Sequence, residues 1–215
     1  RGFVFVLLAF QLATADAADD PGMLWDRLLK QYVIPIRDGQ ATQVDYAGFQ
    51  RDRGVLSQYL ASTLQVTRPD FDKLSRADQI AFLVNVYNAR TVELVLTEYP
   101  NLKSIKDVGT IFQSPWSKRF FSLFGTPFSL DDIEHGMLRK VGYYNEPRVH
   151  FALNCASIGC PALRAEQFIG ARLDAQLEDQ TRKFLADRSR NRFEGHTLAV
   201  SAIFKWYRSD FDHGW

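Results

Sequence analysis

The strongest constraint on the fold is an apolar segment between Ser75 and Pro100 that has the periodicity of a buried helix. Ser75 is a suitable N-cap, with Asp78 three residues later, and Pro100 stops the pattern. Asn85 and Asn88 fall on or beside the apolar faces of the helical wheel. A buried amide left without a partner costs about 1–3 kcal/mol. We therefore expect Asn85 to tie this helix to a loop, whereas Asn88 is either a similar tie or part of a site.

The remaining segments predict shorter helices and hairpins around this helix. In chain order they are a helix over 22–36, a helix over 49–64, a hairpin over 118–128, a short helix capped by Ser129, a mostly helical stretch over 162–188, a hairpin over 192–200 and a helix over 201–211. The sequence shows no internal repeat, no low-complexity tract and no linker. The expected fold is α+β, a helix-dominated single domain with a small antiparallel β-sheet.

The first 17 residues have the pattern of a secretory signal peptide. Arg1 precedes an apolar run from Phe3 to Ala13, and Ala15-Asp16-Ala17 forms an exit of the A-x-A type. The run is shorter than the roughly 20 apolar residues that span a bilayer. We predict cleavage after Ala17, a mature domain over residues 18–215 and a periplasmic or secreted location. An uncleaved N-terminal anchor is the alternative.

Charge and hydropathy exclude two classes of partner for the mature domain. The formal net charge is +1, so the protein as a whole has no field that attracts nucleic acid. The most apolar later stretch is interrupted by polar and charged residues, which predicts no integral membrane segment after cleavage.

A carboxylate interrupts the apolar face of the short helix that follows Ser129. On a helical wheel Glu134 lies within that face, which is made by Leu130, Ile133, Met137, Leu138 and Val141. A carboxylate in such a place must be paired, hydrogen-bonded or protonated. Arg148 and Arg139 are the candidate partners, and His135 faces solvent.

The segment from Arg148 to Pro161 places an imidazole and an amide just before a cysteine. His150 and Asn154 share a face whether the backbone is a strand or a helix. A thiol acts as a nucleophile when a nearby base favours the thiolate, so His150 can serve Cys155 as a base. Glu134 or Asn88 would orient the imidazole. Asn154 and the backbone amides of residues 156–159 would receive an oxyanion.

Cys155 and Cys160 also allow other interpretations. Oxidising compartments let thiols pair, so an exported protein can carry a structural Cys155–Cys160 disulfide. A metal site would use His150 and both cysteines with Glu134 or His135, although the spacing matches no standard zinc pattern. We expect no cofactor.

Four motifs in one order resemble the DUF547 family, a domain of unknown function. The motifs are residues 81–89 (AFLVNVYNA), 131–139 (DDIEHGMLR), 148–161 (RVHFALNCASIGCP), and 203–207 (IFKWY) with Asp210-Phe211. The resemblance covers residues from about 75 to 212. It implies a domain shared by exported bacterial proteins and multidomain eukaryotic ones, without a settled activity. It also implies that Asn88, Glu134, Arg148, His150 and Cys155 belong to the defining pieces of the family.

These observations lead to three functional hypotheses. The first is an exported thiol-dependent hydrolase or acyl transferase that acts on a small-molecule or peptide substrate. The second is a non-enzymatic binding or scaffold domain with a structural disulfide, and the third is a metal-dependent site. In all three we expect Trp206, Tyr207 and Phe211 to belong to the core.

Overall fold

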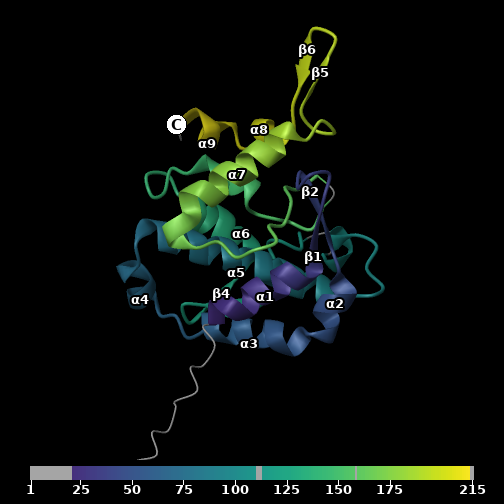
Figure 1. Cartoon of the computed structure of the whole chain (residues 1–215). Helices are drawn as coiled ribbons and strands as arrows, with labels where there is room; N and C mark the ends of the chain where they lie inside the picture. Colours follow the sequence, from purple (N-terminus) through teal and green to yellow (C-terminus); the bar gives the residue numbers. More distant parts are fainter. Residues whose placement is uncertain (1–20, 110–112, 158, 214–215) are drawn as a thin grey trace, which may run out of the picture.

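A central helix, α5 (Arg76–Leu96), organises the protein, and the other elements pack around it (Figure 1). The computed structural model describes residues 21–109, 113–157 and 159–213. The expected signal peptide over residues 1–17 lies outside the described residues. Within the described part of the chain, no helix combines the length and apolar character needed to cross a membrane.

The sequence prediction for α5 is confirmed. The Ser75 hydroxyl accepts a hydrogen bond from the backbone N–H of Asp78, with 3.1 Å between the two atoms. Most residues of the helix are buried, on all of its faces, as expected of a helix inside a core. Its side chains contribute to two separate apolar clusters, one containing Tyr87 and the other containing Val92.

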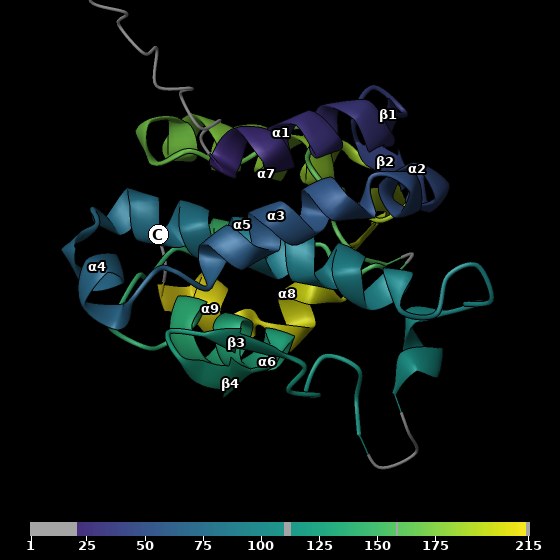
Figure 2. The ribbon, with the colours of Figure 1, turned by 90° about the horizontal axis from the view of Figure 1, so that it is seen from below.

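Helices lie on two sides of α5, above and below it in Figure 1, and Figure 2 shows the lower layer in front. One layer holds α1 (Pro21–Tyr32), α2 (Tyr46–Arg51) and α3 (Arg53–Thr63), and α4 (Arg68–Lys73) precedes α5. The other side holds α6 (Leu130–Ile133), the π-helical turn η2 (Glu134–Leu138) and α7 (Leu173–Ala186). Three short 3₁₀ turns complete the connections: η1 (Ile105–Val108), η3 (Pro147–Phe151) and η4 (Gly170–Arg172).

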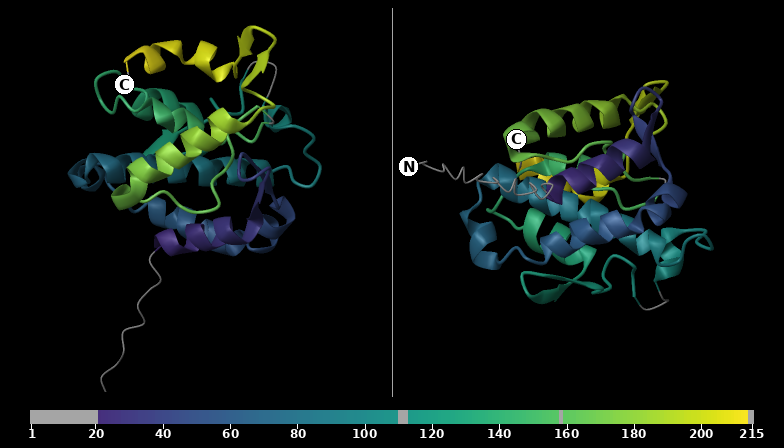
Figure 3. Two further views of the ribbon diagram at one scale, coloured as in Figure 1. Left: turned by 45° about the horizontal axis from the view of Figure 1, so that its top comes forward. Right: turned by 60° about the horizontal axis from the view of Figure 1, so that its bottom comes forward.

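The strands form hairpins, and the predicted α+β class is confirmed. The described strands pair in three separate two-stranded antiparallel sheets: β1 (Val33–Ile36) with β2 (Ala41–Val44), β3 (Phe121–Leu123) with β4 (Thr126–Phe128), and β5 (Arg192–Glu194) with β6 (Thr197–Ala199). The β5–β6 hairpin projects from the body of the protein (Figure 3).

Three predicted helices are wrong in part. The first ends at Tyr32 rather than at residue 36, because Val33–Ile36 pairs with Ala41–Val44 in a hairpin. The second divides at Asp52 into α2 and α3. The stretch over 162–188 becomes helical only from residue 170, because polar side chains hold residues 162–169 in another conformation, as described below.

A third apolar cluster fixes the C-terminal helices α8 (Ile203–Trp206) and α9 (Arg208–His213). Phe151, Phe184 and Ile203 form its buried centre, and Phe211 packs against them. The expectation that Trp206 belongs to the core is wrong, since this side chain is 71% exposed. The cluster connects α9 to η3, and this contact places Asp210 beside His150.

Candidate functional site

A cleft of about 340 Å³ brings together three of the side chains predicted to form the site: Glu134, His150 and Cys155. These residues come from η2, from η3 and from the loop after η3. Aromatic side chains from α5, α8 and the segment before β3 complete the lining. The cleft therefore depends on segments that are far apart in the sequence.

His150 lines this cleft and is buried, with 3% of its surface exposed. Its Nε2 atom lies 2.8 Å from Oδ2 of Asp210, and its ring stacks on Tyr207 with 3.8 Å between the ring centroids. Burial lowers the pKa of His150, and the hydrogen bond to Asp210 offsets part of that effect. The neutral ring that donates from Nε2 to Asp210 leaves Nδ1 as a proton acceptor.

Asp210 is held in place by an arginine as well as by His150. Arg139 reaches both carboxylate oxygens of Asp210, and its Nη1 atom lies 2.6 Å from Nδ1 of His135. Burial alone would raise the pKa of Asp210, but the hydrogen bonds from Arg139 and His150 outweigh it and lower the pKa to about 2. Asp210 is therefore ionised at neutral pH and can stabilise a protonated His150.

Glu134 begins the π-helical turn η2 and is 7% exposed. The hydroxyls of Tyr87 and Tyr207 lie close to it, and burial together with the charge of Glu134 raises the pKa of both phenols. Burial and the nearby charge of Glu134 raise the pKa of Tyr87 well above its usual value, so this phenol remains a proton donor. The two phenols thus give Glu134 polar neighbours within the apolar face predicted for this helix. Turns of the π-helical type, such as the one that Glu134 begins, are frequent at functional sites.

The predicted ion pair between Glu134 and Arg148 is replaced by other partners. Arg148 donates to Glu146 at 2.7 Å and to Asp174 at 2.8 Å. Glu146 is the residue that caps η3, so the guanidinium has a carboxylate only two residues away. Arg148 consequently fixes η3 against α7, and its partners lie outside the lining of the cleft.

Cys155 and Cys160 form a disulfide, with 5.9 Å between their Cα atoms. Both residues line the cleft that contains His150. The structure therefore has the disulfide that the sequence allowed, and it places this disulfide inside the candidate site. Cys155 becomes available as a nucleophile only when the disulfide is reduced.

Asn88 and Asn154 organise the backbone of this loop and are not among the residues that line the cleft. The Asn88 side chain donates to the Ala152 carbonyl at 3.0 Å and accepts from the Asn154 N–H at 2.9 Å. Asn154 in turn donates to the Pro161 carbonyl and accepts from the Ala156 N–H. The predicted roles in orienting His150 and in binding an oxyanion are corrected accordingly, because both amides are already used by the backbone.

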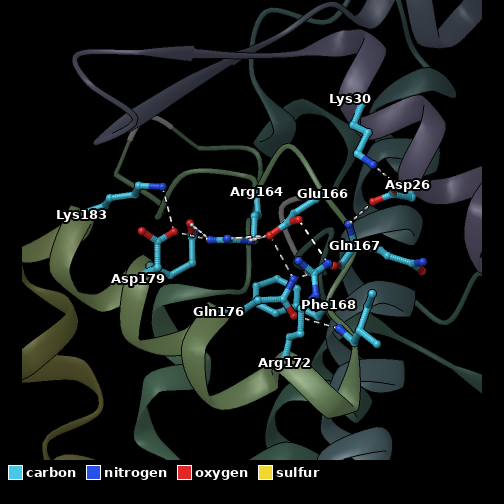
Figure 4. A network of polar contacts seen from close by, with 12 residues as sticks. Asp26, Lys30, Arg164, Glu166, Gln167, Phe168, Arg172, Gln176, Asp179 and Lys183 are labelled. Carbon is cyan, nitrogen blue, oxygen red and sulfur yellow. Dashed lines mark hydrogen bonds and ion pairs between the residues drawn. The ribbon is translucent and has the colours of Figure 1, made fainter.

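Polar contacts also hold the segment that follows Cys160 (Figure 4). As predicted, Asn85 ties α5 to a loop, since its amide bonds both the N–H and the carbonyl of Phe168. Arg164 bridges Glu166 and Asp179, and the carboxylate of Asp26 accepts from the N–H of Gln167. The bonds from Asn85 and Asp26 occupy backbone groups of Phe168 and Gln167 that a helix over 162–169 would have needed.

The described residues do not form the predicted metal site. In the described ranges, no group of three or more His, Cys, Asp and Glu side chains is placed to hold a metal ion. His135 lies exposed at the cleft and contacts Arg139, whereas both cysteine sulfurs are joined to each other.

Sequence reasoning missed three residues of the site. Tyr87 and Tyr207 lie close to Glu134, and Asp210 is hydrogen-bonded to His150. Tyr207 was expected in the core because aromatic residues are usually buried for packing. Tyr87 directly precedes Asn88 on the central helix, and Asp210 follows an aromatic helix by a short turn, but neither position reveals a partner before the chain folds.

Together the fold and the cleft define a helix-dominated α+β protein with a buried His–Asp pair, a buried carboxylate and a disulfide in one site. A family model described as "Protein of unknown function, DUF547" matches residues 71–185, which is more than half of the chain. The chain belongs to the DUF547 family. Comparison with curated proteins and with solved structures gives no match.

The matched segment contains Tyr87, Glu134, His150 and both cysteines, whereas Asp210 lies beyond it. The expected fourth motif over residues 203–211 is thus outside the match. The partner of the histidine is supplied by a part of the chain that the family match does not cover.

The pKa of His150 provides a direct test of this geometry. We expect His150 to titrate below 6.5, and Asp210→Asn to lower its pKa further, because the Asp210 carboxylate favours the imidazolium. Since the folded pKa is the depressed one, this contribution to stability is full above pH 6.5 and is lost as the pH falls through the folded pKa. The measurement is NMR titration of the imidazole Cε1–H resonance.

The exposed Glu98 provides the matched control for this titration. Glu98→Gln should leave the pKa of His150 at its wild-type value. A pKa of His150 that is above 6.5, or that rises in Asp210→Asn, contradicts the assigned pair.

Proposed function

We propose that the protein is an exported thiol-dependent hydrolase or acyl transferase that acts on a small-molecule or peptide substrate. The observation that carries this proposal is the presence of Cys155 in the same cleft as His150, whose imidazole is hydrogen-bonded to Asp210. A nucleophile, a base and a carboxylate that orients the base are the three parts of a nucleophilic acyl-transfer site. The signal-peptide pattern of residues 1–17 supports the exported location.

The reaction begins with reduction of the Cys155–Cys160 disulfide. A dithiol supplies two electrons and two protons, becomes a disulfide itself, and leaves both cysteines as thiols. Nδ1 of His150 then takes the proton of Cys155, and Asp210 stabilises the imidazolium. The thiolate adds to the acyl carbon of the substrate to form a tetrahedral intermediate.

The intermediate collapses when the leaving group takes the proton from His150 and departs. An acyl thioester on Cys155 remains. Water or a second nucleophile, deprotonated by His150, attacks the thioester and releases the thiolate together with the acyl product. The first acceptor gives hydrolysis and the second gives acyl transfer, so one arrangement serves both reactions.

The disulfide itself favours a second candidate function, a binding or scaffold domain without catalysis. In that case Cys155–Cys160 only staples the loop between η3 and residue 161, and the His150–Asp210 pair is a buried structural contact. The two functions differ in one respect, which is whether a reduced Cys155 is unusually reactive.

Alkylation of the reduced protein tests this difference. At pH 7 we expect iodoacetamide to modify Cys155 faster than Cys160, and His150→Gln to slow the reaction at Cys155 by about tenfold, because the base that forms the thiolate is lost. Peptide mass spectrometry measures the two rates separately. Equal rates at both cysteines, unchanged in His150→Gln, indicate the scaffold function.

A further inference from the structure

The cleft contains a buried carboxylate that the proposed reaction does not use. Glu134 is 7% exposed, lines the cleft and lies close to the phenols of Tyr87 and Tyr207. The nearby arginine, Arg139, forms its salt bridge with Asp210. Within the described residues Glu134 forms no salt bridge, so the charge of Arg139 acts on it only from beyond that distance.

Two indole rings line the cleft that contains this carboxylate. Trp116 and Trp206 line the same cleft as Glu134. The ring of Tyr207 is already engaged by His150 and by the guanidinium of Arg139, which lies 4.6 Å from the ring centroid. Tryptophan faces attract cations more strongly than other aromatic rings, with about 0.5–2 kcal/mol for each contact.

The other charged groups at the cleft reinforce a negative potential near Glu134. Asp131 adds a second carboxylate, and burial together with the charge of Glu134 raises the pKa of Asp131. Lys106 also lines the cleft, but its side chain is exposed and therefore screened by water. His135 is bonded through Nδ1 to Arg139, and its pairing with Asp131 is a longer contact of 3.8 Å.

We propose that the substrate of this cleft carries an ammonium group, which pairs with Glu134 and contacts the Trp116 and Trp206 rings. This inference rests on the proposed acyl-transfer function and specifies its substrate class as cationic acyl compounds, such as esters or amides of amino-group-bearing acids. Glu134 is the residue that sets this specificity, whereas Cys155, His150 and Asp210 perform the reaction.

Equilibrium binding to the oxidised protein tests this proposal without any thiol chemistry. The probes are phenethylammonium and its neutral isostere phenethyl alcohol, and the change in tryptophan fluorescence reports occupancy. We expect the wild-type protein to bind the ammonium compound at least about tenfold more tightly. Glu134→Gln should reduce this preference to about equal affinity, whereas Glu98→Gln, which changes an exposed carboxylate, should retain it.

The outcomes separate this proposal from the proposed reaction. Equal binding of both probes to the wild-type protein overturns the cationic substrate, and this comparison requires no variant to fold. An ammonium preference that persists in Glu134→Gln overturns the role of Glu134. Because the disulfide remains intact throughout, an unreactive Cys155 would leave the binding result unchanged, so failure of the reaction is detected only by the alkylation experiment.

Discussion

Cys155→Ser should lower turnover of an activated acyl ester by the reduced protein by about 10³-fold or more. The reason is that serine at this position lacks the acidity of a thiol, while His150 has a lowered pKa and is a weak base for an alcohol. The measurement is release of p-nitrophenol from p-nitrophenyl acetate after reduction of the protein. The expected time course contains a fast first turnover, because acylation precedes hydrolysis of the thioester.

Cys160→Ser provides the matched control. This variant cannot form the Cys155–Cys160 bond, so Cys155 is a free thiol. Its turnover should equal that of the reduced wild-type protein and should not depend on added reductant. Turnover that survives in Cys155→Ser, or that is absent from both the reduced wild-type protein and Cys160→Ser, contradicts the thiol mechanism.

Asn88→Leu should destabilise the protein by about 2–6 kcal/mol, because it leaves one buried and one partly buried backbone group unpaired at about 1–3 kcal/mol each. These groups are the carbonyl of Ala152 and the N–H of Asn154. Leucine has the same branching and the same number of side-chain heavy atoms as asparagine, so the substitution leaves no cavity and the loss reports the missing hydrogen bonds. Urea unfolding followed by circular dichroism measures the difference.

Gln58→Leu is the control for this comparison, since Gln58 is exposed on α3. Its free energy of unfolding should stay within about 0.5 kcal/mol of the wild-type value. If Asn88→Leu unfolds at the same urea concentration as Gln58→Leu, the amide of Asn88 is not the tie between α5 and the loop after η3.

The central helix and its two buried amides could be predicted from the sequence because the signals are local. A serine N-cap, an apolar pattern and a terminating proline lie within one segment. α5 begins after Ser75 as predicted, and it ends at Leu96, before the predicted stop at Pro100. The burial of Glu134 also followed from a helical wheel, although Val141 on the same predicted face is 95% exposed. The helix ends at Leu138 in a π-helical turn, so the wheel no longer applies beyond that residue.

The partners within the site could not be predicted in the same way. The carboxylate at His150 comes from a residue sixty positions later, and the pairing exists only because Phe211 and Ile203 pack against Phe151. Arg148 was expected at Glu134, yet Glu146 lies closer in sequence and Asp174 lies on the neighbouring helix. Such choices between possible partners are made by tertiary packing, which periodicity does not encode.

The same packing imposes an order of assembly on the site during synthesis. Cys155 and Cys160 leave the ribosome before Tyr207 and Asp210. Tyr207 lies at the junction of α8 and α9, and Asp210 lies on α9. Until those helices dock on Phe151, the two thiols are close in sequence while His150 has neither its carboxylate nor its stacking ring. A nascent chain therefore contains both cysteines before His150 has its partners. The two thiols can form a disulfide before Cys155 can act as a nucleophile.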